Sequence, residues 1–203
     1  MQKPDFYRYF LAFRPDLVLR CWLASMRDAA GQTDKVVKAD LFHLTLCVVG
    51  ETFHRDRFIL PRLQAALDHR RLSSCSFFLG RVLGGATGAS VRTIGRQYEI
   101  QDFYRNLVRC LAERDIFPLY RRSGLHPHIT LGYDSCAFAP FSMPIEWIPE
   151  ELLLIESEVG NGVHKVIGGW DLLPPPQGLL PFGGSPVSTV PPCPPGPLRA
   201  TGG

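Results

Sequence analysis

The sequence lacks any apolar run long enough to cross a membrane, because charged residues interrupt its hydrophobic segments. Near the N-terminus, Asp5, Arg8 and Arg14 break up the stretch that would be apolar in a signal peptide. The six cysteines are scattered and form no C-x-x-C pair, which disfavours both a zinc site and a disulfide framework. These absences indicate reduced thiols, so we expect a cytoplasmic protein with no membrane partner.

A strong excess of charge of one sign is missing too. The net charge of +3 is compatible with a polyanionic ligand but does not by itself predict one. With 203 residues, 45% of them hydrophobic, the chain can build one domain with a sizeable core. Proline accounts for ten of the last thirty residues, and Arg199 is the only charged side chain among them. We therefore predict a folded domain over 1–173 and a disordered extension over 174–203.

Hydrophobic periodicity predicts a mixture of strands and helices over this domain. Helices are predicted at Asp16–Ala30, Ile59–His69 and Glu99–Arg114. Strands are predicted at Phe6–Phe13, Lys38–Val49, Cys75–Leu83, Ser90–Gly95, Leu125–Tyr133, Leu152–Glu158 and Val163–Leu172, with a glycine-rich turn at Gly84–Gly88. This order predicts an α+β fold. Because a helix followed by a similar strand recurs in both halves, we expect a bilobal, pseudo-two-fold duplicated fold. Antiparallel sheets would form a central groove, with the helices on the outside.

Two copies of one short pattern stand out: Phe42-His43-Leu44-Thr45-Leu46 and Pro127-His128-Ile129-Thr130-Leu131, with the histidines 85 positions apart. On a β-strand, side chains two positions apart point to the same face. Each copy would therefore present an imidazole and a hydroxyl on one face and bury its aliphatic residues on the other. Two copies in one chain indicate a site in which both halves converge on one reacting group.

A phosphodiester is the group that fits this constellation best. Splitting a P–O bond without a metal needs a base for the attacking oxygen and an acid for the leaving oxygen, and imidazole can serve as either. The hydroxyls of Thr45 and Thr130 can donate hydrogen bonds to the charged non-bridging oxygens. We therefore predict His43 and His128 as the acid–base pair, with no metal or cofactor.

The paired motif resembles the two-histidine phosphoesterase superfamily, which includes the 2′-5′ RNA ligase-like proteins and the RNA 2′,3′-cyclic phosphodiesterases. Phe6–Phe13 resembles the first strand of that family, and residues 152–172 resemble its closing pair of strands. The resemblance covers residues 6 to about 173. It implies that His43 is the proton donor and His128 the proton acceptor.

Four further residues are candidates for contacting the substrate. Arg92 and Arg122 are basic residues close to the predicted groove, and Tyr133 is a candidate platform for a base. His164 lies in a late strand where the family often has an aromatic residue facing the groove, so it is a candidate for stacking on a base. A metal site built on His126 with His128 and His43 is disfavoured, because no carboxylates support it and the threonines fit phosphate better.

The sequence thus predicts a monomeric, metal-independent phosphodiesterase whose partner is RNA or a nucleotide with a phosphodiester or cyclic phosphate end. Hydrolysis of 2′,3′-cyclic phosphates is the reaction that we favour. A 2′-5′ RNA ligase or 2′-5′ phosphodiesterase would use the same four residues, so the motifs do not separate these activities. A nucleotide-binding or RNA-binding module with little turnover is a further alternative, and a structural protein with two coincidental motifs is the least favoured.

Overall fold

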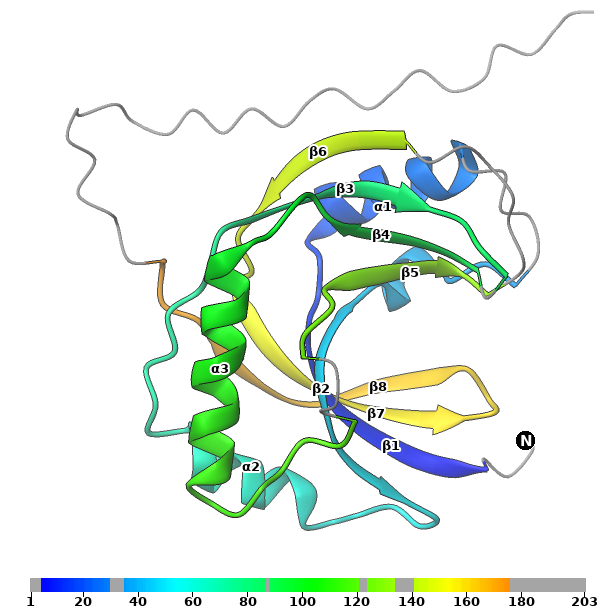
Figure 1. The fold of residues 1–203 in the computed structure, drawn as a ribbon. Coiled ribbons are helices and arrows are strands. Elements are labelled where there is room, and N and C mark those ends of the chain that lie inside the picture. The colour runs from blue at the N-terminus through cyan, green and yellow to red at the C-terminus, as the bar shows by residue number, and fades with distance from the viewer. Residues whose placement is uncertain (1–4, 30–34, 87, 121–123, 134–140, 176–203) are drawn as a thin grey trace, which may run out of the picture.

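The protein is described by a computed structural model that covers residues 5–29, 35–86, 88–120, 124–133 and 141–175, with only the backbone of Phe141. Within these ranges the chain forms one antiparallel sheet of eight strands and three α-helices (Figure 1). The strands are β1 (Phe6–Phe13), β2 (Leu44–Thr52), β3 (Phe77–Leu83), β4 (Ala89–Thr93), β5 (His128–Gly132), β6 (Phe141–Trp147), β7 (Glu151–Val159) and β8 (Val163–Asp171). The helices are α1 (Leu17–Ala29), α2 (Ile59–Leu67) and α3 (Tyr98–Ala112), and a short 3-10 turn, η1, spans Ala39–Leu41.

The order of strands across the sheet is β6-β3-β4-β5-β2-β1-β7-β8. Each motif strand follows a helix in the chain and pairs with the strand before that helix. β1 leads through α1 to β2, and β4 leads through α3 to β5. The two motif strands are neighbours at the middle of the sheet, where they are joined by one registered pair, Leu44 with Ile129. Segments that lie far apart in the sequence are thereby brought side by side.

The two faces of the sheet carry different clusters of apolar residues. Along β1, Tyr9, Leu11 and Phe13 point into the large core, which also takes up the apolar faces of all three helices. Phe10 and Ala12 point to the other face and join a small cluster with residues of β7. The helices therefore cover one face of the sheet, and the other face is left for the motif side chains. No helix in the described ranges is long and apolar enough to span a membrane.

The α+β class, the predicted first strand and the three helices are confirmed, but three expectations need correction. The sheet is single and continuous, where separate antiparallel sheets were expected. The two motif strands begin later than predicted, at Leu44 and His128, because the chain before Leu44 forms η1 and a short extended link. The strand β6 was not predicted, and it contains Pro144, which has no N–H to donate. Because β6 is an edge strand, a proline is tolerated at a position where the N–H would face away from the sheet and would need no partner. The predicted extension lies outside the described residues from position 176 onward.

A substitution in the turn that precedes β4 can test how tightly this turn packs against the second motif strand, β5. Gly88 has a φ of +124°, and a Cβ at this position would collide with the carbonyl oxygen of Gly132 at the end of β5. We predict that Gly88→Ala lowers the free energy of unfolding by about 2–3 kcal/mol, since the new side chain would be strained by both the backbone and the contact.

Gly85→Ala is the matched control, because no heavy atom of the described residues lies within 4 Å of its Cβ position. This variant should change the free energy of unfolding by no more than about 0.5 kcal/mol. Urea denaturation of both variants measures the difference. Equal stability of the two variants would contradict the packing of Gly88 against β5.

Candidate active site

The register between β2 and β5 sets the arrangement of the two motifs. Leu44 is paired with Ile129, and both side chains are fully buried in the core. Continued by one residue in each direction, this antiparallel register puts His43 across from Thr130 and Thr45 across from His128. Residues directly opposite each other in an antiparallel pair share a face and have Cβ atoms roughly 5 Å apart. Each imidazole therefore has the hydroxyl of the other motif as its cross-strand neighbour.

Both motif histidines make the same hydrogen bond with their own backbone. The Nδ1 atom of His43 lies 2.7 Å from the carbonyl oxygen of Leu41, and that of His128 lies 2.9 Å from the carbonyl oxygen of His126. Because a carbonyl oxygen only accepts, each Nδ1 carries a proton and donates it. The Nε2 atom is then the nitrogen that can take up or release a proton at the site. The two halves thus hold their imidazoles in the same tautomer and by the same contact.

A pocket of about 430 Å³ opens on the face of the sheet that the helices leave free. Four predicted residues besides His43 line it: Thr45, Thr130, Tyr133 and His164. The pocket volume falls within the range that is typical of small-molecule sites. His128 is exposed beside it, across from Thr45. The structure therefore brings together both motifs and two of the four predicted substrate contacts.

His164 lies against His43. The two ring centroids are 5.1 Å apart and the rings are nearly perpendicular, at 72°. Phe10 packs against His43 from another direction, with a centroid distance of 4.9 Å, and also meets the edge of His164 at 5.8 Å. The Nδ1 atom of His164 is buried and has no hydrogen-bond partner among the described residues. His43 is therefore enclosed by two rings that offer its imidazole no hydrogen bond.

This enclosure controls the charge of His43. The pKa of His43 is lowered to about 4, mainly by burial and to a smaller extent by the nearby charges of His164, His128 and Arg14. The hydrogen bond to Leu41 opposes the shift but does not cancel it. Burial lowers the pKa of His164 as well. In the free protein at neutral pH, His43 is thus an uncharged base whose proton is carried on Nδ1.

The remaining predicted contacts divide into one that is near the site and one that lies outside the described residues. Arg92 on β4 is the registered partner of His128 on β5, so the two side chains share a face. Arg122 lies outside the described residues. Within those residues, no group of three or more His, Cys, Asp or Glu side chains is placed to hold a metal ion.

Three polar residues of the pocket were missed by the sequence reasoning: Arg8, Ser157 and Glu158. Arg8 and Ser157 are registered partners on β1 and β7, and both line the pocket. Arg8 forms an ion pair with Glu51 at 2.5 Å. The signal for Arg8 in the sequence is the alternation along β1, in which Arg8 shares a face with Phe10 and not with the buried Tyr9. That signal could have been read once the orientation of β1 was known.

The sequence matches no family model and no curated protein. Solved structures nevertheless share its fold. Escherichia coli LigT in complex with 3′-AMP has a TM-score of 0.65 and 20% identity, over 83% of this chain and 99% of LigT. A crystal structure of a phosphoesterase has a TM-score of 0.64 and 19% identity, over 84% of this chain and 99% of the other. TT0787 of Thermus thermophilus has a TM-score of 0.56 and 22% identity, over 81% of this chain and 97% of the other. These likenesses establish that the chain has the fold of LigT, of this phosphoesterase and of TT0787.

The enclosure of His43 leads to a prediction about its titration. We expect the His43 imidazole of the free protein to titrate near pH 4, and to stay neutral at pH 6, because burial disfavours the cation. Adding inorganic phosphate should raise this pKa, since the anion stabilises the imidazolium. NMR spectroscopy of the imidazole protons across a pH series measures both values. A midpoint near 6.5 that does not respond to phosphate would contradict this account of the site.

Proposed function

We propose that the protein is a metal-independent phosphodiesterase that acts on RNA ends or small nucleotides and hydrolyses 2′,3′-cyclic phosphates. The observation that carries this proposal is the pairing of two His-x-Thr motifs across β2 and β5, with each Nδ1 held by a backbone carbonyl. The likeness of the fold to E. coli LigT, which has been solved with 3′-AMP and with phosphate, supports the proposal.

In the proposed reaction, the Nε2 atom of His128 takes a proton from a water molecule as the water oxygen attacks the phosphorus. The bond between phosphorus and one ribose oxygen then breaks, and Nε2–H of His43 gives its proton to that oxygen. The hydroxyls of Thr45 and Thr130 donate hydrogen bonds to the non-bridging oxygens, where negative charge increases in the transition state. The reaction consumes one water molecule and leaves a phosphate monoester.

The donor role of His43 requires a proton that the free protein does not hold at neutral pH, because the pKa of this residue is about 4. A phosphodiester brings a negative charge into the pocket, and an opposite charge next to a buried imidazole raises its pKa. We therefore infer that substrate binding is coupled to proton uptake by His43. An acid that is charged only when the substrate is present also avoids the cost of a buried cation in the free protein.

We propose further that the two halves of the sheet are copies of one unit, related by a pseudo-two-fold axis between β2 and β5, and that they form a bilobal fold with a central groove. Counted outward from the middle, one half runs β5-β4-β3-β6 and the other β2-β1-β7-β8. Both begin with the motif strand followed by the strand that precedes its helix. This symmetry would explain why the site is built from two equivalent pairs of residues.

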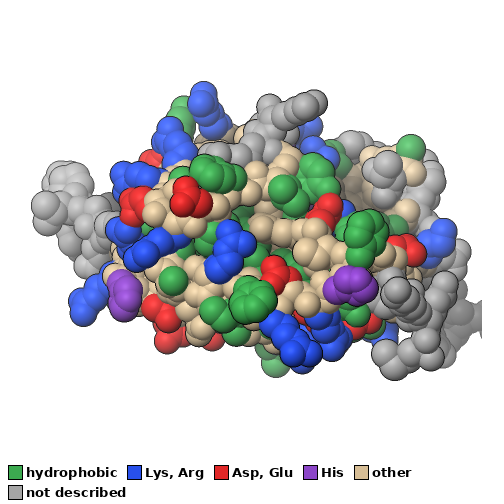
Figure 2. All heavy atoms as spheres, turned by 90° about the horizontal axis from the view of Figure 1, so that it is seen from below, with side chains coloured by type: hydrophobic (Ala, Val, Ile, Leu, Met, Phe, Trp, Pro, Cys, Tyr) green, Lys and Arg blue, Asp and Glu red, His purple; other side chains and the backbone are tan. Residues whose placement is uncertain are grey.

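Recognition of the substrate is proposed to occur at the pocket, not over a broad basic surface. On the face seen in Figure 2, Lys and Arg side chains are interspersed with Asp and Glu side chains. Such a mixed surface does not supply the continuous positive track that proteins use to bind long nucleic acids. A 2′-5′ phosphodiesterase or ligase would use the same four groups. Incubation with cyclic phosphates, 2′-5′ dinucleotides and tRNA halves, followed by analysis of the products, separates these activities.

Replacing each histidine tests the acid and base roles. His43→Ala and His128→Ala should each reduce the turnover of a 2′,3′-cyclic phosphate by about two to four orders of magnitude, the usual scale of general acid–base catalysis. A nitrophenyl phosphodiester has a leaving group that needs no proton. On this substrate the turnover of His43→Ala should therefore be close to that of the unmodified protein, whereas the turnover of His128→Ala should stay low.

His126→Ala is the matched control, because it removes an exposed imidazole two residues from His128 and keeps the carbonyl that orients His128. It should retain near-normal turnover. Recovery of His128→Ala, and not of His43→Ala, on the nitrophenyl ester would reverse the assigned roles. Near-normal activity of His128→Ala on the cyclic phosphate would refute the acid–base pair.

Rate measurements against pH and chelator test the proposed chemistry without any substitution. Turnover should persist in EDTA and should fall on both sides of an optimum, because one imidazole must be neutral while the other is protonated. The two limbs report the coupled pair, not single residues. Removal of 174–203 should leave the profile unchanged if the domain comprises 1–173. Loss of activity in EDTA with recovery on adding zinc or manganese would favour the metal site built on His126.

A further inference from the structure

A row of basic side chains extends from the second motif across two further strands. Arg92 on β4 is the registered partner of His128 on β5, and Arg81 on β3 is the registered partner of Arg92. Neighbouring strands lie about 4.8 Å apart, so Arg81 is attached roughly 10 Å from His128 along the row. The same line continues on the other side through Thr45 of β2. The row is thus a direct extension of the candidate site.

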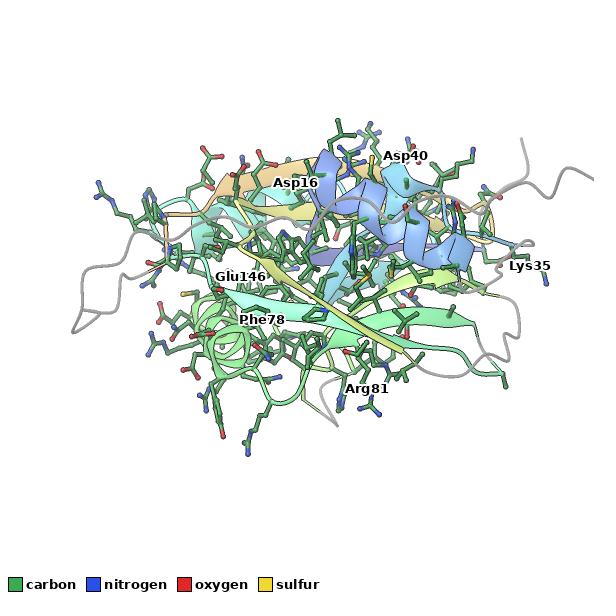
Figure 3. The ribbon with its side chains drawn as sticks, turned by 90° about the horizontal axis from the view of Figure 1, so that it is seen from above. Asp16, Lys35, Asp40, Phe78, Arg81 and Glu146 are labelled. Carbon is green, nitrogen blue, oxygen red and sulfur yellow. The ribbon has the colours of Figure 1, made fainter. Side chains whose placement is uncertain are left out.

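All three members of the row are exposed on the face that carries the pocket. Their neighbours along each strand, Val82, Val91 and Ile129, are fully buried and point into the core. The side chain of Arg81 projects away from α1 (Figure 3). Because alternate residues of a strand point to opposite faces, the two arginines and His128 share the face that the helices do not cover.

The charges in this row are not compensated within the described part of the chain. Arg8 and Arg55 form ion pairs with carboxylates, whereas neither Arg81 nor Arg92 has such a partner among the described residues. Like charges directly opposite each other on neighbouring strands destabilise a sheet. An anion bound between the two guanidinium groups would remove this repulsion, and guanidinium groups suit phosphate oxygens because they can donate two parallel hydrogen bonds.

We propose that Arg81 and Arg92 bind a second phosphate of the substrate, next to the phosphodiester that reacts between His43 and His128. This inference rests on the proposed function and refines its substrate class. A 2′,3′-cyclic mononucleotide has no second phosphate to offer the row. The preferred substrate is therefore an oligonucleotide that ends in a cyclic phosphate, with the preceding phosphodiester held by the two arginines.

Steady-state kinetics on three substrates test the proposal: a 2′,3′-cyclic mononucleotide, the same mononucleotide with a 5′-phosphate, and a dinucleotide that ends in the cyclic phosphate. The unmodified protein should have a kcat/KM at least tenfold higher for the dinucleotide than for the cyclic mononucleotide. Arg81→Ala and Arg92→Ala should each lower kcat/KM for the dinucleotide about tenfold. Arg81→Ala, whose side chain lies one strand further from His128, should change kcat/KM for the cyclic mononucleotide less than twofold. The 5′-phosphorylated mononucleotide shows whether any second phosphate suffices or whether the next nucleotide is needed.

Arg109→Ala is the matched control. It removes the same charge from an exposed position on α3, which packs on the opposite face of the sheet, and it should leave all three substrates unaffected. Replacement of Arg92 by Lys should restore only part of the loss, because an ammonium group does not reproduce the two-pronged contact. The plot of log kcat/KM for the dinucleotide against log salt should become shallower, by roughly 0.7 in slope when both arginines are removed, the value for one phosphate contact on a single strand.

Binding of a dinucleotide that cannot react, measured by fluorescence anisotropy, separates failure of this inference from failure of the proposed function. Weaker binding by the two arginine variants, with no turnover by the unmodified protein, would refute the phosphodiesterase and retain the second phosphate site. Equal losses on mononucleotide and dinucleotide, or losses matched by Arg109→Ala, would overturn the second phosphate site and leave the phosphodiesterase intact. No loss in either arginine variant would also overturn it.

Discussion

The single registered contact between β2 and β5 is the constraint on which the site depends. Leu44 and Ile129 are fully buried, and their burial in the common core fixes which residues face the pocket. A slip by one residue would turn the aliphatic side chains outward and bury the imidazoles, so the hydrophobic effect that stabilises the core also sets the geometry of the site. Two motifs separated by 85 positions therefore converge through packing in the common core.

Burial has a second consequence, which is electrostatic. The rings of Phe10 and His164 enclose His43, and its pKa falls to about 4. An exposed imidazole at this position would be partly charged at neutral pH without any ligand. We propose that the enclosed imidazole instead takes up its charge when an anion binds, which would link the protonation of His43 to the presence of the substrate.

The fold could be read from the sequence to a large extent, because the apolar patterns of β1 and α3 and the two His-x-Thr motifs are strong local signals. The register across β2 and β5 could not be read, because it is set by packing between distant segments. Three features of the site follow from that register or from tertiary contacts: the pairing of Arg92 with His128, the contact of His164 with His43, and the low pKa of His43. The edge strand β6 was missed because Pro144 argues against a strand when the position of the strand in the sheet is unknown.

The central claim is that both histidines bind one phosphate group. A crystal structure with a bound nucleoside 2′-phosphate tests this claim most directly, because ring opening leaves this monoester when the 3′ oxygen departs. The account predicts the phosphate group in the pocket between β2 and β5. Its oxygens should lie within hydrogen-bond distance of the Nε2 atoms of His43 and His128 and of the hydroxyls of Thr45 and Thr130. A phosphate that contacts only one of the two motifs, or that binds away from the β2–β5 pair, would contradict the account.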